Sequence, residues 1–275
     1  MSPLARTVHA AGTVPRARRV TSDAVFVGVS ALCFAASTAA TIAGSASMSA
    51  MGELPMPGGW TMSRAWMPMC GQTWAGVAAS LAGMWVVMMV TMMLPSLMPM
   101  LWRYREAVGG TRVGRLTVLV SAGYFGVWAV FGIAVFALGV TLAVLVMRLP
   151  ALARAVPVAV GMVVLLAGAL QFTAWKARHL ACCRASRGHC RKLPADALAA
   201  WRHGVRLGLH CCHCCAGLTM MLLVIGVMDL RAMAVVATAI TCERLAPGGQ
   251  RVARVVGAMV VSGGVFLVAR GVALG

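Results

Sequence analysis

The chain has 275 residues, of which 61% are hydrophobic and only 11% are charged. This composition excludes an ordinary water-soluble domain, because too few polar side chains remain to cover its surface. The formal net charge of +18 would suit nucleic-acid binding, but the basic residues separate apolar runs instead of forming one patch, which argues against a nucleic-acid partner.

The predicted elements are helices. Thirty glycines and only two tyrosines favour closely packed helices over an outer-membrane barrel, which needs aromatic girdles. We therefore predict an all-α fold, a polytopic transmembrane helical bundle of about seven spans. The expected spans lie near residues 24–46, 73–101, 116–147, 156–175, 207–228, 232–250 and 252–270. Together they form one predicted transmembrane domain over residues 24–270.

Two of these runs depart from a simple crossing. The third run is longer than an upright span, which needs about 20 residues. This length predicts that the helix tilts or extends beyond the bilayer. The sixth is the weakest, because Glu243 and Arg244 interrupt it. Glu243 at that depth is a candidate functional residue, and an ion pair between Glu243 and Arg244 is the alternative.

The basic residues predict the orientation. Residues 1–23 form a basic arm, and a cytoplasmic arm places most of the 24 Lys and Arg residues on the cytoplasmic side. The loop at residues 47–72 then lies outside, and the basic loop at residues 176–206 lies inside. A cleaved signal peptide is the alternative for the first run, although that run exceeds the usual signal-peptide core.

The predicted outer loop at residues 47–72 is rich in sulfur. Its soft donors are Met48, Met51, Met56, Met62, Met67, Met69 and Cys70. Thioethers in this number suit a capture segment for a soft metal on the outer face. The alternative is an interfacial loop that dips its methionines into lipid.

The second run carries methionines at four-residue steps, including Met84, Met88 and Met92. A thioether is a soft, uncharged ligand, so Met88 and Met92 are candidate Cu(I) ligands. The same stripe is also typical of simple core packing. Pro95 and Pro99 follow in this run, and they predict that the helix bends or breaks.

The most unusual stretch is Leu209-His-Cys-Cys-His-Cys-Cys215, at the start of the fifth run. Helical spacing brings residues three and four apart onto one face, and the preceding loop adds further Cys and His residues. The candidate ligands are His179, Cys183, His210, Cys211, Cys214 and Cys215. Cys182, His189 and Cys190 lie in the same loop. Thiolate and imidazole donors select Cu(I) or zinc over hard cations, whereas buried thiols acting as small hydrophobes are the alternative.

At these residues the chain resembles an uncharacterised bacterial family of predicted metal-binding integral membrane proteins. The resemblance covers about residues 75–270. The motifs are residues 85–95 with Pro99, Cys183-Arg184, Trp201-Arg202, Cys211-xx-Cys214-Cys215, residues 226–233 and Glu243. The chain departs from the family where His179 replaces a frequent cysteine and where Asp229 replaces a frequent asparagine. The resemblance implies metal binding and a place in the bacterial inner membrane, but no activity.

Three hypotheses follow for the function. The first is a membrane protein that handles, transports or delivers a soft metal, copper or else zinc, with a metallochaperone or a membrane metalloprotein as partner. The second is a thiol–disulfide redox protein that uses Cys211, Cys214 and Cys215. The third is a structural or assembly factor for a membrane metalloprotein. The sequence contains no nucleophile elbow, phosphate-binding loop or zinc-protease signature, so it offers no positive case for hydrolysis or nucleotide chemistry.

Overall fold

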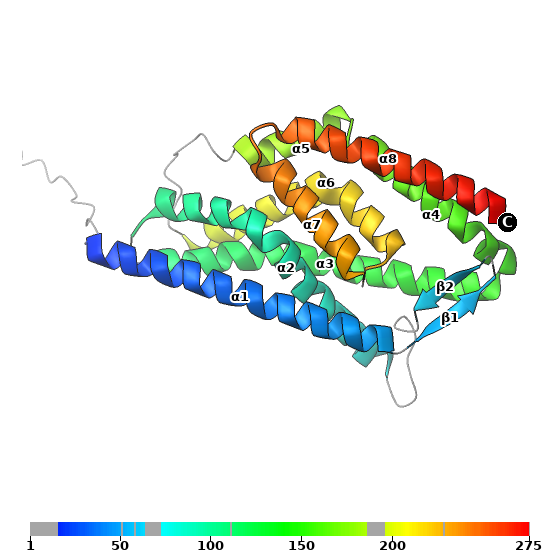
Figure 1. Ribbon diagram of the computed structural model, residues 1–275. Coiled ribbons are helices and arrows are strands. Elements are labelled where there is room, and N and C mark those ends of the chain that lie inside the picture. The colour runs from blue at the N-terminus through cyan, green and yellow to red at the C-terminus, as the bar shows by residue number, and fades with distance from the viewer. Residues whose placement is uncertain are drawn as a thin grey trace, which may run out of the picture.

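The computed structural model describes residues 16–50, 52–57, 59–63, 73–110, 112–185, 196–227 and 229–274. This part of the chain forms eight helices and one β-hairpin (Figure 1). The elements are α1 (Arg16–Ala50), β1 (Glu53–Met56), β2 (Trp60–Ser63), α2 (Trp74–Val108), α3 (Val113–Arg148), α4 (Pro150–Leu170), α5 (Ala174–Ala185), α6 (Ala197–Ile225), α7 (Leu230–Leu245) and α8 (Gly249–Leu274). The predicted all-α class is confirmed.

Six helices are long and apolar enough to cross a membrane: α1, α2, α3, α4, α6 and α8. The predicted run at 232–250 does not form one continuous helix. Helix α7 has 16 residues and ends at Leu245, and Pro247 follows in the turn before α8. Helix α7 nevertheless returns the chain toward the end of the bundle where α8 begins, so the start of α1 and the end of α8 lie at opposite ends (Figure 1).

The predicted run at 156–175 also differs from the structure. Helix α4 ends at Leu170, and a short turn separates it from α5. The hydroxyl of Thr173 accepts a hydrogen bond from the backbone N–H of Lys176, 3.3 Å away, which caps the new helix. The turn gives α5 its own direction, so α5 packs against α6 and α7.

Helix α6 lies against α3, α4, α5 and α7, which makes it the central element of the site described below. Its close approach to α3 depends on Gly204, where a Cβ would stand 2.1 Å from the carbonyl oxygen of Val120. Gly208 lies one turn later, and a Cβ there would stand 2.9 Å from the Tyr124 carbonyl oxygen. The pair of glycines thus brings the α6 backbone directly onto α3.

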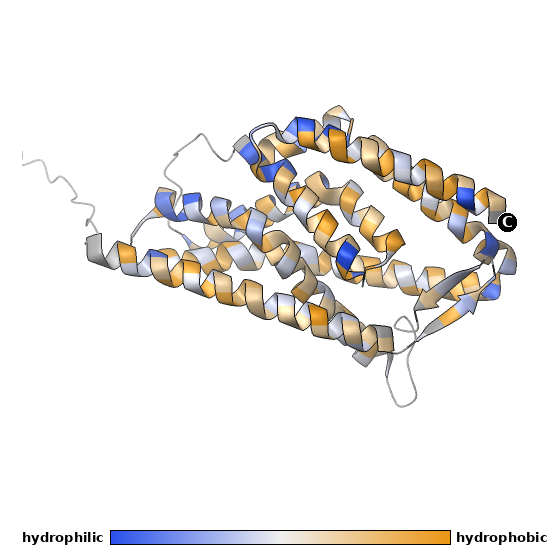
Figure 2. Cartoon of the chain, viewed as in Figure 1, coloured by the Kyte–Doolittle hydropathy of each residue, from blue (hydrophilic) through white to orange (hydrophobic). Residues whose placement is uncertain are grey.

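The outer surface of the bundle is apolar. Hydrophilic residues gather toward the helix ends, while the middle sections are hydrophobic (Figure 2). Large side chains such as Val130, Leu166 and Phe266 are 69%, 61% and 65% exposed. A surface of this kind needs an apolar environment or a partner to cover it.

Helix α2 remains one helix through Pro95 and Pro99, and its axis bends between its two halves (Figure 1). The sequence predicted that this helix bends or breaks, and in the structure it bends without breaking. At the far end of α2 the hairpin pairs Leu54 with Met62. The indole N–H of Trp60 donates to the carbonyl of Ala153, 2.9 Å away, and this bond fixes the hairpin against α4.

Candidate metal centre

Four buried thiols meet at the packing surface of α5 and α6. Cys211, Cys214 and Cys215 come from one face of α6, as their three- and four-residue spacing predicts, and each is at most 1% exposed. The sulfurs of Cys211 and Cys215 lie 3.8 Å apart. Cys183 of α5 completes the sulfur cluster by a hydrogen bond with the Cys214 thiol. This hydrogen bond and burial raise the pKa of the Cys183 thiol well above its usual value.

The bent helix α2 adds thioethers to this cluster. The Cys211 sulfur lies 3.9 Å from Sδ of Met93. Met88, Met89, Met92 and Met93 are all at most 2% exposed and lie in the same core. The predicted ligands Met88 and Met92 are therefore buried core side chains, and Met93 is the methionine that contacts a cysteine.

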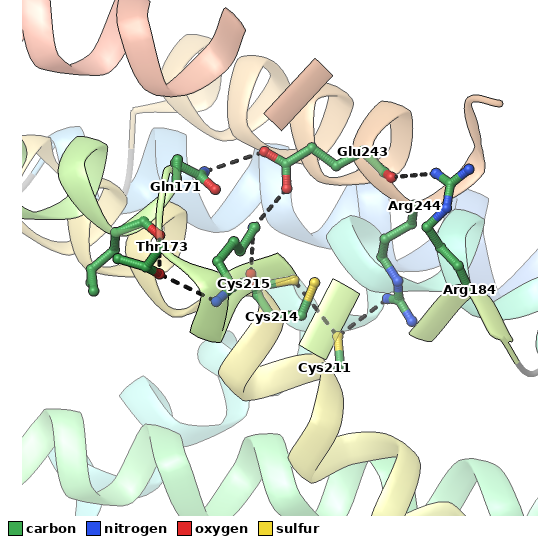
Figure 3. A network of polar contacts seen from close by, with 10 residues as sticks. Gln171, Thr173, Arg184, Cys211, Cys214, Cys215, Glu243 and Arg244 are labelled. Carbon is green, nitrogen blue, oxygen red and sulfur yellow. Dashed lines mark hydrogen bonds and ion pairs between the residues drawn. The ribbon is translucent and has the colours of Figure 1, made fainter. Parts of the chain in front are cut away.

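A guanidinium and a phenol also contact Cys211. Arg244 of α7 donates to Sγ of Cys211 at 3.2 Å (Figure 3). The same guanidinium donates to Oγ of Ser96 at 2.8 Å. The hydroxyl of Tyr124 in α3 donates to the same sulfur at 2.9 Å. Donors from two helices therefore surround one thiol, and both favour the charged thiolate form of that sulfur.

A buried ion pair supports the other side of the cluster. Lys176 Nζ lies 2.7 Å from a carboxylate oxygen of Glu243 and also donates to the backbone carbonyl of Cys214. The amide of Gln171 donates to the second oxygen of Glu243 at 3.2 Å (Figure 3). Arg184 donates to the backbone carbonyl of Glu243 at 2.9 Å. Glu243 thus pairs with Lys176 of α5, and its predicted alternative partner, the adjacent Arg244, faces the sulfur cluster instead.

Three histidines lie beside the cluster, on α5 and α6. The ring of His179 stacks on that of His213 with centroids 5.0 Å apart and lies 5.9 Å from that of His210. Trp175 packs edge-on against His179 at 4.8 Å. Partial burial, followed by repulsion from His213 and His210, lowers the pKa of His179. His179 is therefore neutral at pH 7, the form in which imidazole binds a metal.

The structure thus gathers the predicted donors into two neighbouring groups. His179 lies one helical turn before Cys183, and His210 one turn before Cys214, so the imidazoles flank the thiols but do not join them. Within the described ranges, no three His, Cys, Asp or Glu side chains are arranged to hold a metal ion. Met51, Met67, Met69, Cys70, His189 and Cys190 lie outside the described residues.

Several residues of the site escaped sequence reasoning. Lys176 and Gln171 flank the turn between α4 and α5, and only the folded chain brings them to Glu243. Tyr124 is one of only two tyrosines in the chain and lies inside an apolar run, which is a weak indication of a functional role. A buried phenol needs a hydrogen-bond partner, which here is Cys211.

A family model described as "PpoB2: Copper chaperone" matches residues 82–267, more than half of the chain. The chain belongs to the PpoB2 copper chaperone family. The match begins in α2 just before the buried methionines and extends through the sulfur cluster and α7 into α8. The family description names copper, so the zinc alternative gains no support from it. No curated protein and no solved structure matches the chain.

Proposed function

We propose that this PpoB2-family chain is a membrane-embedded protein that binds Cu(I) as cargo and delivers it to a partner metalloprotein. The observation that carries the proposal is the sulfur cluster itself. Four thiols from α5 and α6 lie together with the Met93 thioether, away from water. Thiolate and thioether donors in a dry site suit Cu(I) better than any hard cation.

The charge around the cluster also suits a monovalent ion. Two thiolates and one Cu(I) carry a net charge of minus one, which the guanidinium of Arg244 neutralises at hydrogen-bonding distance from Cys211. A neutral assembly avoids the cost of leaving an uncompensated charge in a low-dielectric interior. Lys176 and Glu243 already neutralise each other and leave this balance unchanged.

Metal binding requires a small rearrangement of the thiols. They now hydrogen-bond to one another, as the contacts between Cys211 and Cys215 and between Cys183 and Cys214 indicate. Binding of Cu(I) replaces these S–H contacts and releases protons, because the ligands are thiolates. The three histidines of α5 and α6 are then candidate donors for passing the ion outward.

The membrane setting is part of the proposal. The six long apolar helices and the apolar outer surface support insertion. The excess of basic residues at 1–23, 103–115 and 176–206 supports a cytoplasmic amino terminus and therefore a cluster that faces the cytoplasm. The inner membrane of a bacterium is the corresponding location.

The direct test is metal binding by the detergent-purified chain under reducing conditions. The triple variant Cys211→Ser/Cys214→Ser/Cys215→Ser should lose Cu(I) binding in competition with a chelator. The matched control Cys33→Ser/Cys182→Ser/Cys242→Ser replaces three exposed thiols and should bind like the wild type. Equal Cu(I) binding by both variants, or none by the wild type, would overturn the proposal.

The same variants separate copper binding from thiol–disulfide exchange. Exchange requires attack by a thiolate on an accessible sulfur, and the cluster thiols are almost completely buried. We expect Cu(I) to slow alkylation of the wild-type thiols by a small reagent beyond the protection that burial alone gives the metal-free chain, until a chelator removes the ion. If protection of the thiols from alkylation instead changes with added oxidant and reductant and does not respond to copper, the redox alternative is favoured.

A further inference from the structure

A second group of methionines lines a cavity at the hairpin end of the bundle. The cavity has a volume of about 570 Å³. Its sulfur-bearing lining residues are Met48 of α1, Met62 of β2, and Met84 and Met88 of α2. Met48, Met62 and Met88 are at most 8% exposed, so their thioethers face the interior and not the solvent. Three elements thus bring four methionines to the lining of one cavity.

The position of each methionine has a structural cause. Trp60 and Met62 lie on the same face of β2, so the bond from the Trp60 indole to α4 also holds Met62 over the cavity. Gly44 of α1 leaves room for Met84, because a Cβ at Gly44 would stand 2.6 Å from the Met84 sulfur. The indole N–H of Trp85 donates a hydrogen bond to the Trp128 carbonyl, 2.9 Å away, and Trp85 forms part of the cavity wall.

The charge of the cavity lining suits a soft monovalent cation. Asp229 is the one carboxylate among the described lining residues. It accepts hydrogen bonds from the backbone N–H groups of Arg231 and Ala232 and so caps α7. Its carboxylate keeps a negative charge, which favours a cation, and the thioethers are the soft donors among the described lining residues; they bind Cu(I) without releasing a proton.

We propose that this cavity is an entry site for Cu(I), separate from the sulfur cluster. Met88 belongs both to the cavity and to the buried methionine run that ends at Met93, which contacts Cys211. The axial distance from Met84 to Met93 is about 13 Å, at about 1.5 Å per residue. Copper remains Cu(I) throughout and exchanges thioether ligands for thiolates. The route rests on the proposed copper binding at the sulfur cluster, whereas the cavity site stands without it.

The test compares methionine variants in a background without cluster thiols. This thiol-free background carries serine in place of all ten cysteines, which are Cys33, Cys70, Cys182, Cys183, Cys190, Cys211, Cys212, Cys214, Cys215 and Cys242. The cavity variant adds Met48→Leu, Met62→Leu, Met84→Leu and Met88→Leu, which keep an apolar lining of similar volume. The control variant instead adds Met147→Leu, Met162→Leu, Met220→Leu and Met259→Leu, which lie on the outer surface at 44–62% exposure. The probe is Ag(I), a redox-inert stand-in for Cu(I), at equilibrium with the full chain in detergent.

The background and the control variant should each retain about one equivalent of Ag(I), which the cavity variant loses. X-ray absorption of the retained ion should show thioether sulfur in its first shell. Equal Ag(I) binding by cavity and control variants would overturn the entry site. A lipid or another apolar ligand would occupy the leucine-lined cavity equally well, so it cannot mimic the expected difference. Met84→Leu alone should weaken binding at least tenfold, which guards against misfolding of the quadruple variant.

The route has its own readout in chains that keep the thiols. Substitution at the cavity should slow the appearance of the Cu(I)–thiolate absorption band after Cu(I) is added, without changing its final amplitude. An unchanged rate would overturn the route while leaving the equilibrium result intact. Failure of the thiol site itself would appear differently, as the absence of this band in the wild type.

Discussion

At the scale of single residues, the site is organised around Cys211. This thiol receives hydrogen bonds from Tyr124 and Arg244 and lies within 3.9 Å of the sulfurs of Cys215 and Met93. A thiolate buried without such partners would carry a large desolvation cost. The cationic guanidinium at 3.2 Å offsets that cost. In the proposed Cu(I) site, Arg244 is thus a positioning residue that stabilises the Cys211 thiolate without binding the ion.

We therefore predict that Arg244→Met weakens Cu(I) binding by about ten- to a hundredfold, the equivalent of about 1.5–3 kcal/mol for a charge-assisted hydrogen bond. Arg244→Lys retains the charge and should lose less affinity. Chelator competition measures the affinity, and circular dichroism verifies that each variant remains helical. Arg251→Met removes an exposed arginine near the start of α8 and serves as the control. Wild-type affinity in Arg244→Met would contradict the charge argument.

The cysteines of the cluster could be predicted from the sequence better than the charged residues around them. The three- and four-residue spacing of Cys211, Cys214 and Cys215 defines one helical face whatever the tertiary structure, so their juxtaposition could be predicted. The pairing of Glu243 with Lys176 could not, because the two residues are 67 positions apart and meet only when α5 turns away from α4. The adjacent Arg244 was the natural partner in sequence, but successive helical residues point in different directions.

At the scale of elements, α6 positions the site through its contact with α3. A Cβ at Gly204 would overlap the Val120 carbonyl, so the two backbones touch where most helix pairs are separated by side chains. This contact also sets the distance between Tyr124 of α3 and Cys211 of α6. Helix packing and the geometry of the sulfur cluster therefore depend on the same small residues.

The substitution Gly204→Ala should separate α6 from α3 and destabilise the protein by about 1–3 kcal/mol, the range for overpacking a close contact. The Tm in detergent should fall, and Cu(I) binding should weaken with it as Tyr124 moves away from Cys211. The control Gly83→Ala introduces the same methyl group on α2, where nothing lies within 4 Å. It should leave the Tm unchanged or raise it, because alanine is the better helix former. Equal Tm values for the two variants would contradict a tight α3–α6 contact.

Helix boundaries were harder to predict than helix existence. The long runs correspond to α1, α2, α3, α6 and α8, because apolar length alone identifies them. The run predicted at 232–250 extends across Pro247, but the helix ends at Leu245, since proline lacks the backbone donor and two glycines follow it. Similarly, α5 carries three Lys and Arg residues together with buried side chains, so its composition resembles a loop.

At the scale of the whole molecule, the distribution of polarity is the reverse of that in a soluble protein. Large apolar side chains cover the outside, whereas Lys176, Glu243 and Arg244 are at most 4% exposed. Buried charges of this kind need partners inside the protein, and the contacts with Gln171 and the sulfur cluster provide them. The central polar network and the apolar exterior together favour a lipid environment.

The short helix α7 decides on which side the chain ends. Its 16 residues span about 24 Å, whereas the hydrocarbon core of a membrane is about 30 Å thick. Its polar end, however, is buried against α5, where Lys176 satisfies Glu243, so lipid need not cover that end. Because α7 returns the chain to the end of the bundle where α8 begins, we predict seven passes through the membrane (Figure 1).

Reporter fusions to the full chain test this prediction. An amino-terminal fluorescent reporter should be active in the cytoplasm, and a carboxyl-terminal alkaline phosphatase should be active on the opposite side, because an odd number of passes separates the two ends. The reciprocal fusions should be silent. If α7 merely lay within the protein without carrying the chain across, six passes would remain and both ends would report from the same side. That outcome would place α8 in the reverse orientation, although Figure 1 shows it antiparallel to its neighbour α4.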